Sequence, residues 1–199
     1  MKSDDWNRRY AAAELDWSAG PNRLFAAEVA DLPAGRALDL ACGGGRNAIW
    51  LAEQGWDVTA VDYAEVALEK ARAIAARRGV APHFVHADLL EYRPADGAFD
   101  LVAVLYLQLP AAERHVVLQR AAAAVAPGGT FLLVGHDLLN LTEGHGGPTD
   151  ASVLYTADDV VADLTGLEPV RAERVLRDVE GAERPAIDVV VRATAPAPG

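Results

Sequence analysis

The chain has 199 residues, 51% of them hydrophobic and 24% charged, and its 18 basic and 29 acidic residues give a formal net charge of −11. That hydrophobic fraction can fill a core, which argues against a disordered chain. The negative charge disfavours nucleic acid and anionic membranes as partners, because both would repel it. The one cysteine, Cys42, excludes an intramolecular disulfide and a cysteine-based zinc site.

The sequence begins with a segment that reads as helical and rich in aromatic residues, over residues 1–35. An alternation of strands and helices follows. In chain order we predict a strand at 36–42, a helix at 46–55, a strand at 57–62, a helix at 64–79, strands at 83–88 and 99–107, a helix at 110–125, and a strand at 130–137 after an "APGG" turn.

The remaining third changes character, with a Gly/Pro-rich stretch, a short helix at 156–166 and two strand patterns at 169–179 and 186–194. We therefore predict an α/β fold of the Rossmann-like, doubly wound kind. It has a mostly parallel seven-stranded sheet with helices on both faces and an antiparallel C-terminal hairpin.

We expect one domain over residues 1–199, without a second domain or an internal repeat. Its parts are a helical cap (1–35), a core (36–137), a lid-like loop (138–152), a helix and hairpin (153–194) and a frayed tail (195–199). No apolar run approaches the roughly 18 residues of a membrane span, and the first residues lack the apolar centre of a signal peptide. The sequence therefore predicts a cytoplasmic protein, either a monomer or a homodimer.

The stretch "LDLACGGGRNA" places three glycines between the first predicted strand and its helix. Glycine lets the backbone turn tightly and approach a ligand, while the helix start offers unpaired N–H groups. The spacing of Gly43, Gly45 and Ala48 also fits a dinucleotide fingerprint. A nicotinamide cofactor and another nucleoside ligand both remain open from the glycines alone.

Three aspartates separate these alternatives. Asp39 precedes the glycines, Asp62 ends the second strand, and Asp88 ends the third. A carboxylate at the second strand end can accept both hydroxyls of a ribose, and one at the third can accept an adenine amino hydrogen. Each aspartate alone could be a helix cap. A dinucleotide explains Asp62 but gives no role to Asp39 or Asp88.

With "VTAVD" and "VHADL" following the glycine motif, the chain resembles the class I S-adenosylmethionine (SAM)-dependent methyltransferases from about residue 36 to residue 137. "CGGGRNAIWLA" and "WNRRY" are similar to the small tellurite-resistance-type and related small-molecule methyltransferases, in which an N-terminal segment caps the cofactor. The resemblance implies SAM as cofactor and S-adenosylhomocysteine as product. It does not transfer an oxyanion-contacting role to Arg174 or Arg177.

The resemblance also implies roles for individual residues. Asp39 would receive the methionine amino group, Asp62 the ribose hydroxyls, and Leu105 would lie near the transferring methyl with Tyr106. The remaining implied cofactor contacts are Cys42, Gly43, Gly45, Arg46 and Asn47 at the methionine and ribose, and Tyr63, Asp88 and Leu89 at the adenine.

Methyl transfer is an in-line displacement that requires positioning and exclusion of water, and a base only where the acceptor carries a proton. His136, at the end of the fifth strand, and Tyr10 are the candidate catalytic residues, although a histidine there could equally satisfy local backbone groups. We expect no metal site and no catalytic thiol at Cys42.

We therefore predict a methyltransferase that acts on a small-molecule nucleophile: a thiol, an oxyanion, a hydroxyl or a carboxylate. A non-catalytic domain that binds SAM or S-adenosylhomocysteine is the alternative from another class. An NAD-dependent oxidoreductase is the distant one.

Overall fold

The computed structural model describes residues 3–12 and 20–197, in two compact units that meet in the sequence between Arg93 and Pro94. Its seven-stranded sheet has the strand order β3-β2-β1-β4-β5-β7-β6. Only β7 runs against its neighbours, so the predicted mixed sheet with an antiparallel C-terminal hairpin is confirmed. No described helix has the length and apolar character needed to cross a membrane.

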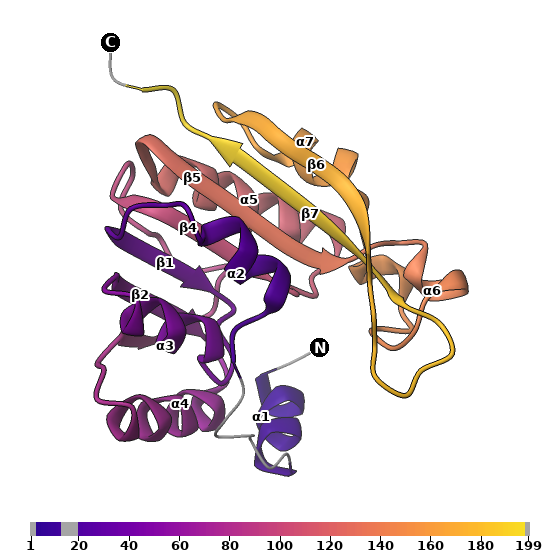
Figure 1. Ribbon diagram of the computed structural model, residues 1–199, viewed down its shortest axis with the longest axis horizontal. Helices are drawn as coiled ribbons and strands as arrows, with labels where there is room; N and C mark the ends of the chain where they lie inside the picture. Colours follow the sequence, from indigo (N-terminus) through magenta and orange to yellow (C-terminus); the bar gives the residue numbers. More distant parts are fainter. Residues whose placement is uncertain (1–2, 13–19, 198–199) are drawn as a thin grey trace. The chain divides into compact units, whose positions relative to one another are not determined.

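The first unit, residues 1–93, contributes three parallel strands. These are β1 (Arg36–Leu40), β2 (Asp57–Asp62) and β3 (His83–His86), and β2 has the predicted bounds. Helices α3 (Arg46–Glu53) and α4 (Glu65–Arg77) pack beside each other and against these strands (Figure 1). Ile49 and Ile74 meet there in an apolar cluster that buries the inner faces of both helices.

Two further helices, α1 (Ser3–Ala12) and α2 (Arg23–Val29), lie within the predicted helical cap. Helix α1 packs on α4, where the Asn7 side chain accepts a hydrogen bond from the Val66 amide (3.2 Å). Asn22 caps the start of helix α2, and its side chain accepts a hydrogen bond from the Phe25 amide (3.0 Å). Residues 1–2 and 13–19 of the predicted cap lie outside the described residues.

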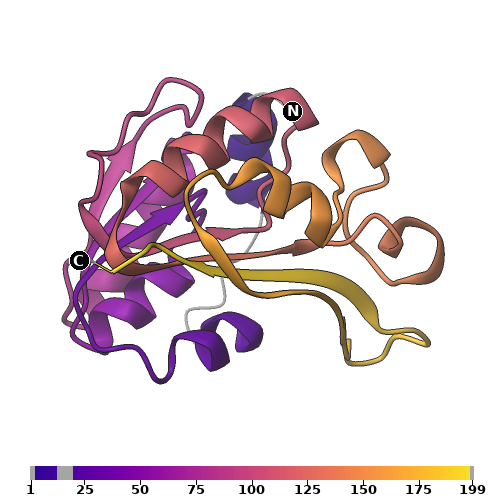
Figure 2. The same ribbon diagram turned by 90° about the horizontal axis from the view of Figure 1, so that it is seen from above.

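The second unit, residues 94–199, contributes four strands and most of the C-terminal helices. The strands are β4 (Phe99–Leu105), β5 (Val125–His136), β6 (Glu168–Arg177) and β7 (Ala186–Thr194). Helices α5 (Ala111–Ala124) and α7 (Ala157–Asp163) lie together on one side of these strands, as Figure 2 shows. Strand β6 forms the exposed edge, and Leu176 on it is 68% exposed.

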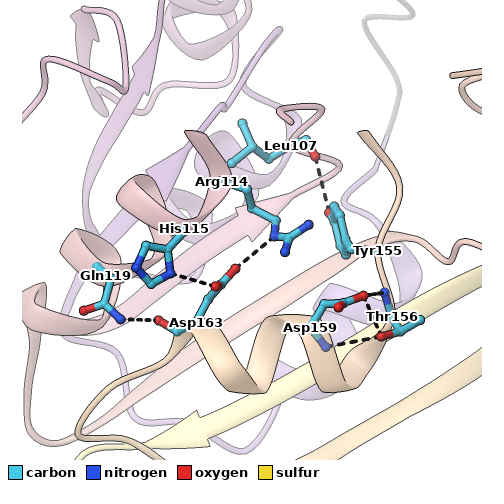
Figure 3. A network of polar contacts seen from close by, with 8 residues as sticks. All are labelled: Leu107, Arg114, His115, Gln119, Tyr155, Thr156, Asp159 and Asp163. Atoms are coloured by element: carbon cyan, nitrogen blue, oxygen red, sulfur yellow. Dashed lines mark hydrogen bonds and ion pairs between the residues drawn. The ribbon is translucent and has the colours of Figure 1, made fainter. Parts of the chain in front are cut away.

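The joint between α5 and α7 is a polar network of Arg114, His115, Gln119 and Asp163, here called the helix-joint cluster (Figure 3). The Asp163 carboxylate lies 3.0 Å from Arg114 Nε and 2.8 Å from His115 Nδ1. Gln119 donates to the Asp163 carbonyl (2.8 Å). At the other end of α7, Thr156 and Asp159 form a capping box that fixes where the helix begins.

Three segments differ from the sequence-based expectation. Strand β5 begins at Val125 rather than Thr130, because the "APGG" segment pairs with β4 through an irregular register instead of forming a separate turn. The 138–152 segment contains a short helix, α6 (Asn140–Glu143), and a 3-10 turn (Ala151–Val153). In the predicted frayed tail, Ala195 hydrogen-bonds to Gly128 and Gly129, while residues 198–199 lie outside the described part.

Candidate functional site

The turn after β1 is built from residues with left-handed backbone angles. Ala41, Gly43 and Gly45 have φ values of 61°, 53° and 76°. A Cβ at Gly45 would lie 2.9 Å from the Ala71 Cβ and 3.1 Å from the Phe84 ring, and one at Gly43 would collide with the Tyr10 hydroxyl. Packing inside the unit alone therefore requires glycine at position 45, whatever the ligand.

Asp62, at the carboxyl end of β2, holds this turn in place. Its carboxylate accepts hydrogen bonds from the backbone amides of Gly43 (2.8 Å) and Ala64 (2.8 Å). Burial raises the pKa of Asp62, and these amides partly offset that effect. Since a carboxylate can accept about four hydrogen bonds, Asp62 retains acceptor capacity for a ligand beside its structural role.

Asp39, on β1, has no such partners. The residue is 1% exposed, and neither carboxylate oxygen has a hydrogen-bond partner among the described residues. Burial, reinforced by the negative charge of Asp62, raises the pKa of Asp39 to about 7. A buried acid without a donor is costly to the fold and suited to a ligand that brings a positive charge and N–H groups.

The residues around the start of α3 differ in their exposure and in the contacts that their side chains already make. The Asn47 side-chain oxygen accepts a hydrogen bond from the Asn22 amide (2.9 Å), so it secures the segment before α2, whereas Arg46 is exposed. Cys42 is buried, and burial together with the charges of Asp39 and Asp62 raises the pKa of its thiol well above the ordinary value. The thiol therefore stays protonated and is a poor nucleophile.

Tyr10 lies over the glycine turn. The Tyr10 carbonyl accepts a hydrogen bond from Lys70 of α4, and the Tyr10 ring stands beside Trp6 with centroids 6.0 Å apart. Burial and the charge of Asp62 raise the pKa of the Tyr10 hydroxyl. The hydroxyl is therefore a hydrogen-bond donor at neutral pH, and not a base.

The predicted adenine contacts follow β2 and β3. Asp88 is exposed, and its carboxylate accepts the Leu90 amide (2.9 Å), which is the turn-capping role that a strand-end aspartate can have without a ligand. Tyr63 and Leu89 are half-buried, and the Tyr63 carbonyl lies 3.0 Å from His86 Nε2. All predicted cofactor residues except Leu105 thus belong to the first unit.

In the second unit, Leu105 is buried at the end of β4, and Tyr106 follows with a φ of 54°. A bulky residue in the left-handed region is strained, and such strain concentrates at functional positions. The Tyr106 amide donates to the Val134 carbonyl (2.7 Å), which holds the residue at the ends of β4 and β5.

Four polar side chains meet at this end of the second unit: Tyr106, His136, Arg177 and Asp188, here called the sheet-end cluster. Asp188 is fully buried and accepts from the Tyr106 hydroxyl (2.8 Å) and Arg177 Nε (2.6 Å). His136 Nδ1 lies 3.1 Å from the other carboxylate oxygen. Burial raises the pKa of Asp188, but the nearby His136 imidazole and the hydrogen bonds from Arg177 and Tyr106 outweigh it and hold that pKa below its ordinary value.

A second ion pair lies beside this cluster. Asp137 is 1% exposed, and its carboxylate lies 2.9 Å from Arg174 Nε and accepts the Leu139 amide (2.8 Å). Arg174 and Arg177 therefore both bind carboxylates of their own chain. Neither arginine is arranged as an unpaired anion ligand.

Asp188 and the role of Arg177 were missed by the sequence reasoning. The available signal is the lone acid in the apolar run "AIDVVV", since an ionised side chain inside a buried strand requires partners. The register of β5 and β7 sets Asp188 directly opposite His136, which the sequence alone does not specify. No group of three metal-binding side chains is found within residues 3–12 and 20–197.

The chain matches a methyltransferase family model and curated methyltransferases. A family model described as a methyltransferase domain matches residues 37–129. Trans-aconitate 2-methyltransferase of Sinorhizobium fredii is 36% identical over 139 residues, which cover 68% of this chain and 51% of that protein. The 2-heptyl-1-hydroxyquinolin-4(1H)-one methyltransferase of Mycobacteroides abscessus is 31% identical, covering 63% and 58%.

Among solved structures, the N-methyltransferase NodS of Bradyrhizobium japonicum, in complex with S-adenosyl-L-homocysteine, matches with a TM-score of 0.71 at 19% identity. The match covers 98% of this chain and 100% of that one. At this identity the match shows the shared fold alone. The chain spans about half the length of the first curated relatives that it matches.

Proposed function

The chain belongs to the class I SAM-dependent methyltransferases, and on that premise we propose that it transfers a methyl group from SAM to a small-molecule nucleophile. The family prediction is confirmed, and the NAD-dependent alternative is set aside because the matched family model is that of a methyltransferase domain. The names of the two curated relatives, which refer to small molecules, support a small acceptor.

The observation that carries the proposal is the state of Asp39. Neither oxygen of its buried carboxylate has a hydrogen-bond partner among the described residues, and Gly43 follows four residues later. The methionine part of SAM carries an ammonium group, which supplies both the charge and the N–H donors that Asp39 lacks. The residues present therefore fit the family's cofactor at this position.

We assign the remaining cofactor contacts in the same way. Asp62 would hold the ribose hydroxyls while keeping its bonds to the Gly43 and Ala64 amides. The further proposed contacts are Cys42, Gly43, Gly45, Arg46, Asn47, Tyr63, Asp88, Leu89 and Leu105. The side-chain oxygen of Asn47 already serves Asn22, so we assign its contact to the backbone amide at the helix start.

Methyl transfer from SAM requires mainly that the protein position the acceptor against the methyl group. SAM supplies an activated methyl on a sulfonium, so the chain's own residues need to bind, orient and exclude water. Tyr10 would close over the glycine turn as a hydrogen-bond donor, and His136 would contact the acceptor. A metal or a covalent intermediate is not required.

The test is calorimetric titration of SAM into the wild type and an Asp39→Asn variant. We expect the variant to bind at least tenfold more weakly, since a charge-assisted hydrogen bond contributes about 1.5–3 kcal/mol. Asp57, exposed at the opposite end of β2, gives the matched control Asp57→Asn, which should bind like the wild type. Equal affinity of all three proteins would refute the assignment.

The pH dependence adds a second readout. Because burial raises the pKa of Asp39 to about 7, SAM binding to the ionised acid requires loss of a proton below that pH. The apparent affinity should fall about tenfold for each pH unit below 7 in the wild type and stay flat in Asp39→Asn. A screen with labelled SAM over thiols, hydroxyls, oxyanions and carboxylates then separates an enzyme from a non-catalytic binding domain.

A further inference from the structure

His86, at the end of β3, lies beside the residues that we assign to the adenosine part of SAM. In the parallel register of β2 and β3 it stands opposite Asp62. The Ala87 amide donates to the Asp62 carbonyl (3.0 Å), and His86 Nε2 lies 3.0 Å from the Tyr63 carbonyl oxygen. Two consecutive residues at the end of β3 thus hold two consecutive carbonyls at the end of β2.

The partner atom determines which ring nitrogen of His86 carries hydrogen. A carbonyl oxygen can only accept, so a hydrogen bond to the Tyr63 carbonyl requires a hydrogen on Nε2. The neutral ring in this tautomer has that hydrogen, and so does the protonated ring. His86 therefore holds the Tyr63 carbonyl in both protonation states.

The Tyr63 backbone links the end of β2 to the start of α4. On one side of it, the Asp62 carboxylate accepts hydrogen bonds from the Gly43 and Ala64 amides (2.8 Å each). On the other side, Ala64 occupies the N-cap position of α4 and has no side chain that could cap the helix. The helix thus begins without a side-chain cap of its own, and the bond from His86 restrains the chain one residue earlier.

The exposure of His86 separates this bond from the packing of the core. His86 is exposed, whereas Asp62 is buried and Tyr63 half-buried. Truncating an exposed imidazole leaves no cavity, so the stability of the fold should depend little on it. The imidazole also lies near enough to Asp62 that its charge, when present, opposes the burial that raises the pKa of that carboxyl.

We propose that His86 is a positioning residue for the nucleoside part of SAM. It holds the Tyr63 carbonyl and thereby fixes the segment in which Asp62 meets the ribose and Tyr63 lies at the adenine. This inference rests on the proposed methyltransferase function, and it adds a residue that acts through Tyr63 without touching SAM. Its effect is confined to the nucleoside part, because the proposed methionine contact, Asp39, lies on β1 and has neither His86 nor Tyr63 as a hydrogen-bond partner.

The first test separates the two parts of the cofactor. Calorimetry measures the affinity of the wild type and His86→Ala for SAM and for methylthioadenosine, which retains the adenine and the ribose but lacks the amino-acid part. We expect His86→Ala to weaken the binding of both ligands by the same factor, about three- to tenfold, which corresponds to the net contribution of one hydrogen bond. Asp39→Asn should instead weaken the binding of SAM alone.

Further substitutions show whether the hydrogen bond itself is responsible. His86→Gln keeps an N–H donor and should bind both ligands within about twofold of the wild type. His86→Phe keeps a ring without a donor and should match His86→Ala. The matched control is His83→Ala, which removes the other exposed histidine of β3 and should leave both affinities unchanged.

The second test needs no ligand. In ¹⁵N-labelled protein, the amide signals of Gly43 and Ala64 report on the Asp62 carboxylate, to which both amides donate. These signals should shift in His86→Ala and stay in place in His83→Ala and His86→Gln. The urea denaturation midpoint of His86→Ala should stay close to that of the wild type, because the imidazole is exposed.

Equal affinities of the wild type and His86→Ala for both ligands would overturn the proposal, as would wild-type affinity in His86→Phe or unmoved Gly43 and Ala64 signals. A loss for SAM that methylthioadenosine does not share, or a wild type that binds SAM but not methylthioadenosine, would also overturn it, because neither places the effect at the nucleoside. A large drop in the denaturation midpoint of His86→Ala would show a structural role instead. A wild type that binds neither ligand would refute the proposed function itself.

Discussion

The second unit contains two clusters with the same three residue types and different surroundings. In the helix-joint cluster, Asp163 contacts Arg114 and His115, and in the sheet-end cluster, Asp188 contacts Arg177 and His136. The arginine is buried and the histidine half-exposed in the first, with 7% and 53% of their side chains accessible. In the second, Arg177 is 32% accessible and His136 14%.

The two clusters differ in which partner of the carboxylate is buried, the arginine or the histidine. At the helix joint the buried cation needs the carboxylate, and Gln119 adds bonds to the Asp163 carbonyl and to Thr165, so the cluster ties α5 to α7. At the sheet end, the His136 imidazole is more buried than the Arg177 guanidinium. The Asp188 carboxylate is therefore neutralised by an arginine that reaches solvent. The same three residue types thus form a buried joint between two helices in one place and a partly accessible cluster at the strand ends in the other.

The largest expected effect is on stability at the helix joint. Asp163→Ala leaves the Arg114 guanidinium buried without its carboxylate, so the free energy of unfolding should fall by about 3–5 kcal/mol. Urea denaturation measures this loss, and SAM affinity of the folded protein should be unchanged. A loss below about 1 kcal/mol would mean that the two clusters do not differ in the way described.

A smaller effect, with a characteristic pH dependence, is expected at the sheet end. Because hydrogen bonds hold the pKa of Asp188 below its ordinary value of 3.8, the ionised acid stabilises the fold above about pH 4, and this stabilisation disappears as the pH falls below that value. Asp188→Asn should therefore cost about 2 kcal/mol from pH 8 to pH 5, and progressively less below pH 4. Denaturation series across pH check this, and a cost that grows on acidification would contradict it.

Arg177→Lys should have a still smaller effect. A lysine retains the charge but cannot reproduce the guanidinium Nε contact or its position near the Tyr106 ring. We expect the free energy of unfolding, measured by urea denaturation, to fall by about 1 kcal/mol. A matched exposed change, Arg171→Lys on the same strand, should leave the stability unaltered.

The smallest effect is expected for His115→Gln. The imidazole is half-exposed, and the buried Arg114–Asp163 pair persists without it. Stability measured by thermal denaturation should change by no more than about 0.5 kcal/mol. A change above 1 kcal/mol would show that His115 holds the helix joint as firmly as Arg114.

The sequence predicted the strand–helix alternation well because apolar runs and glycine turns are local signals. Strands 57–62 and 186–194 have the predicted bounds. The spacing of Asp39 and Asp62 predicted both as cofactor contacts. Whether each carboxylate already accepts hydrogen bonds from its own chain depends on which backbone amides surround it in the fold. Asp62 accepts hydrogen bonds from the Gly43 and Ala64 amides. Neither oxygen of Asp39 has a hydrogen-bond partner among the described residues, although the nearby Ala48 amide lowers its pKa and partly offsets burial.

The sheet-end cluster could not be predicted in the same way. His136 was a candidate from its place at the end of a strand, whereas Asp188 lies 52 residues later and meets it only through the register of β5 and β7. Likewise, the early start of β5 follows from pairing with β4 across an irregular register, and no local pattern encodes that pairing.

The unsatisfied carboxylate of Asp39 has an evolutionary consequence. Raising its pKa from 3.8 to about 7 costs the ionised, ligand-free fold up to about 4 kcal/mol above pH 7. Gly45 would persist in any descendant with this packing, because Ala71 and Phe84 exclude a side chain there. Asp39 is under no such constraint, so a lineage that abandoned its ligand would gain stability by replacing it, and a neutral residue at this position would mark a descendant that has lost the activity.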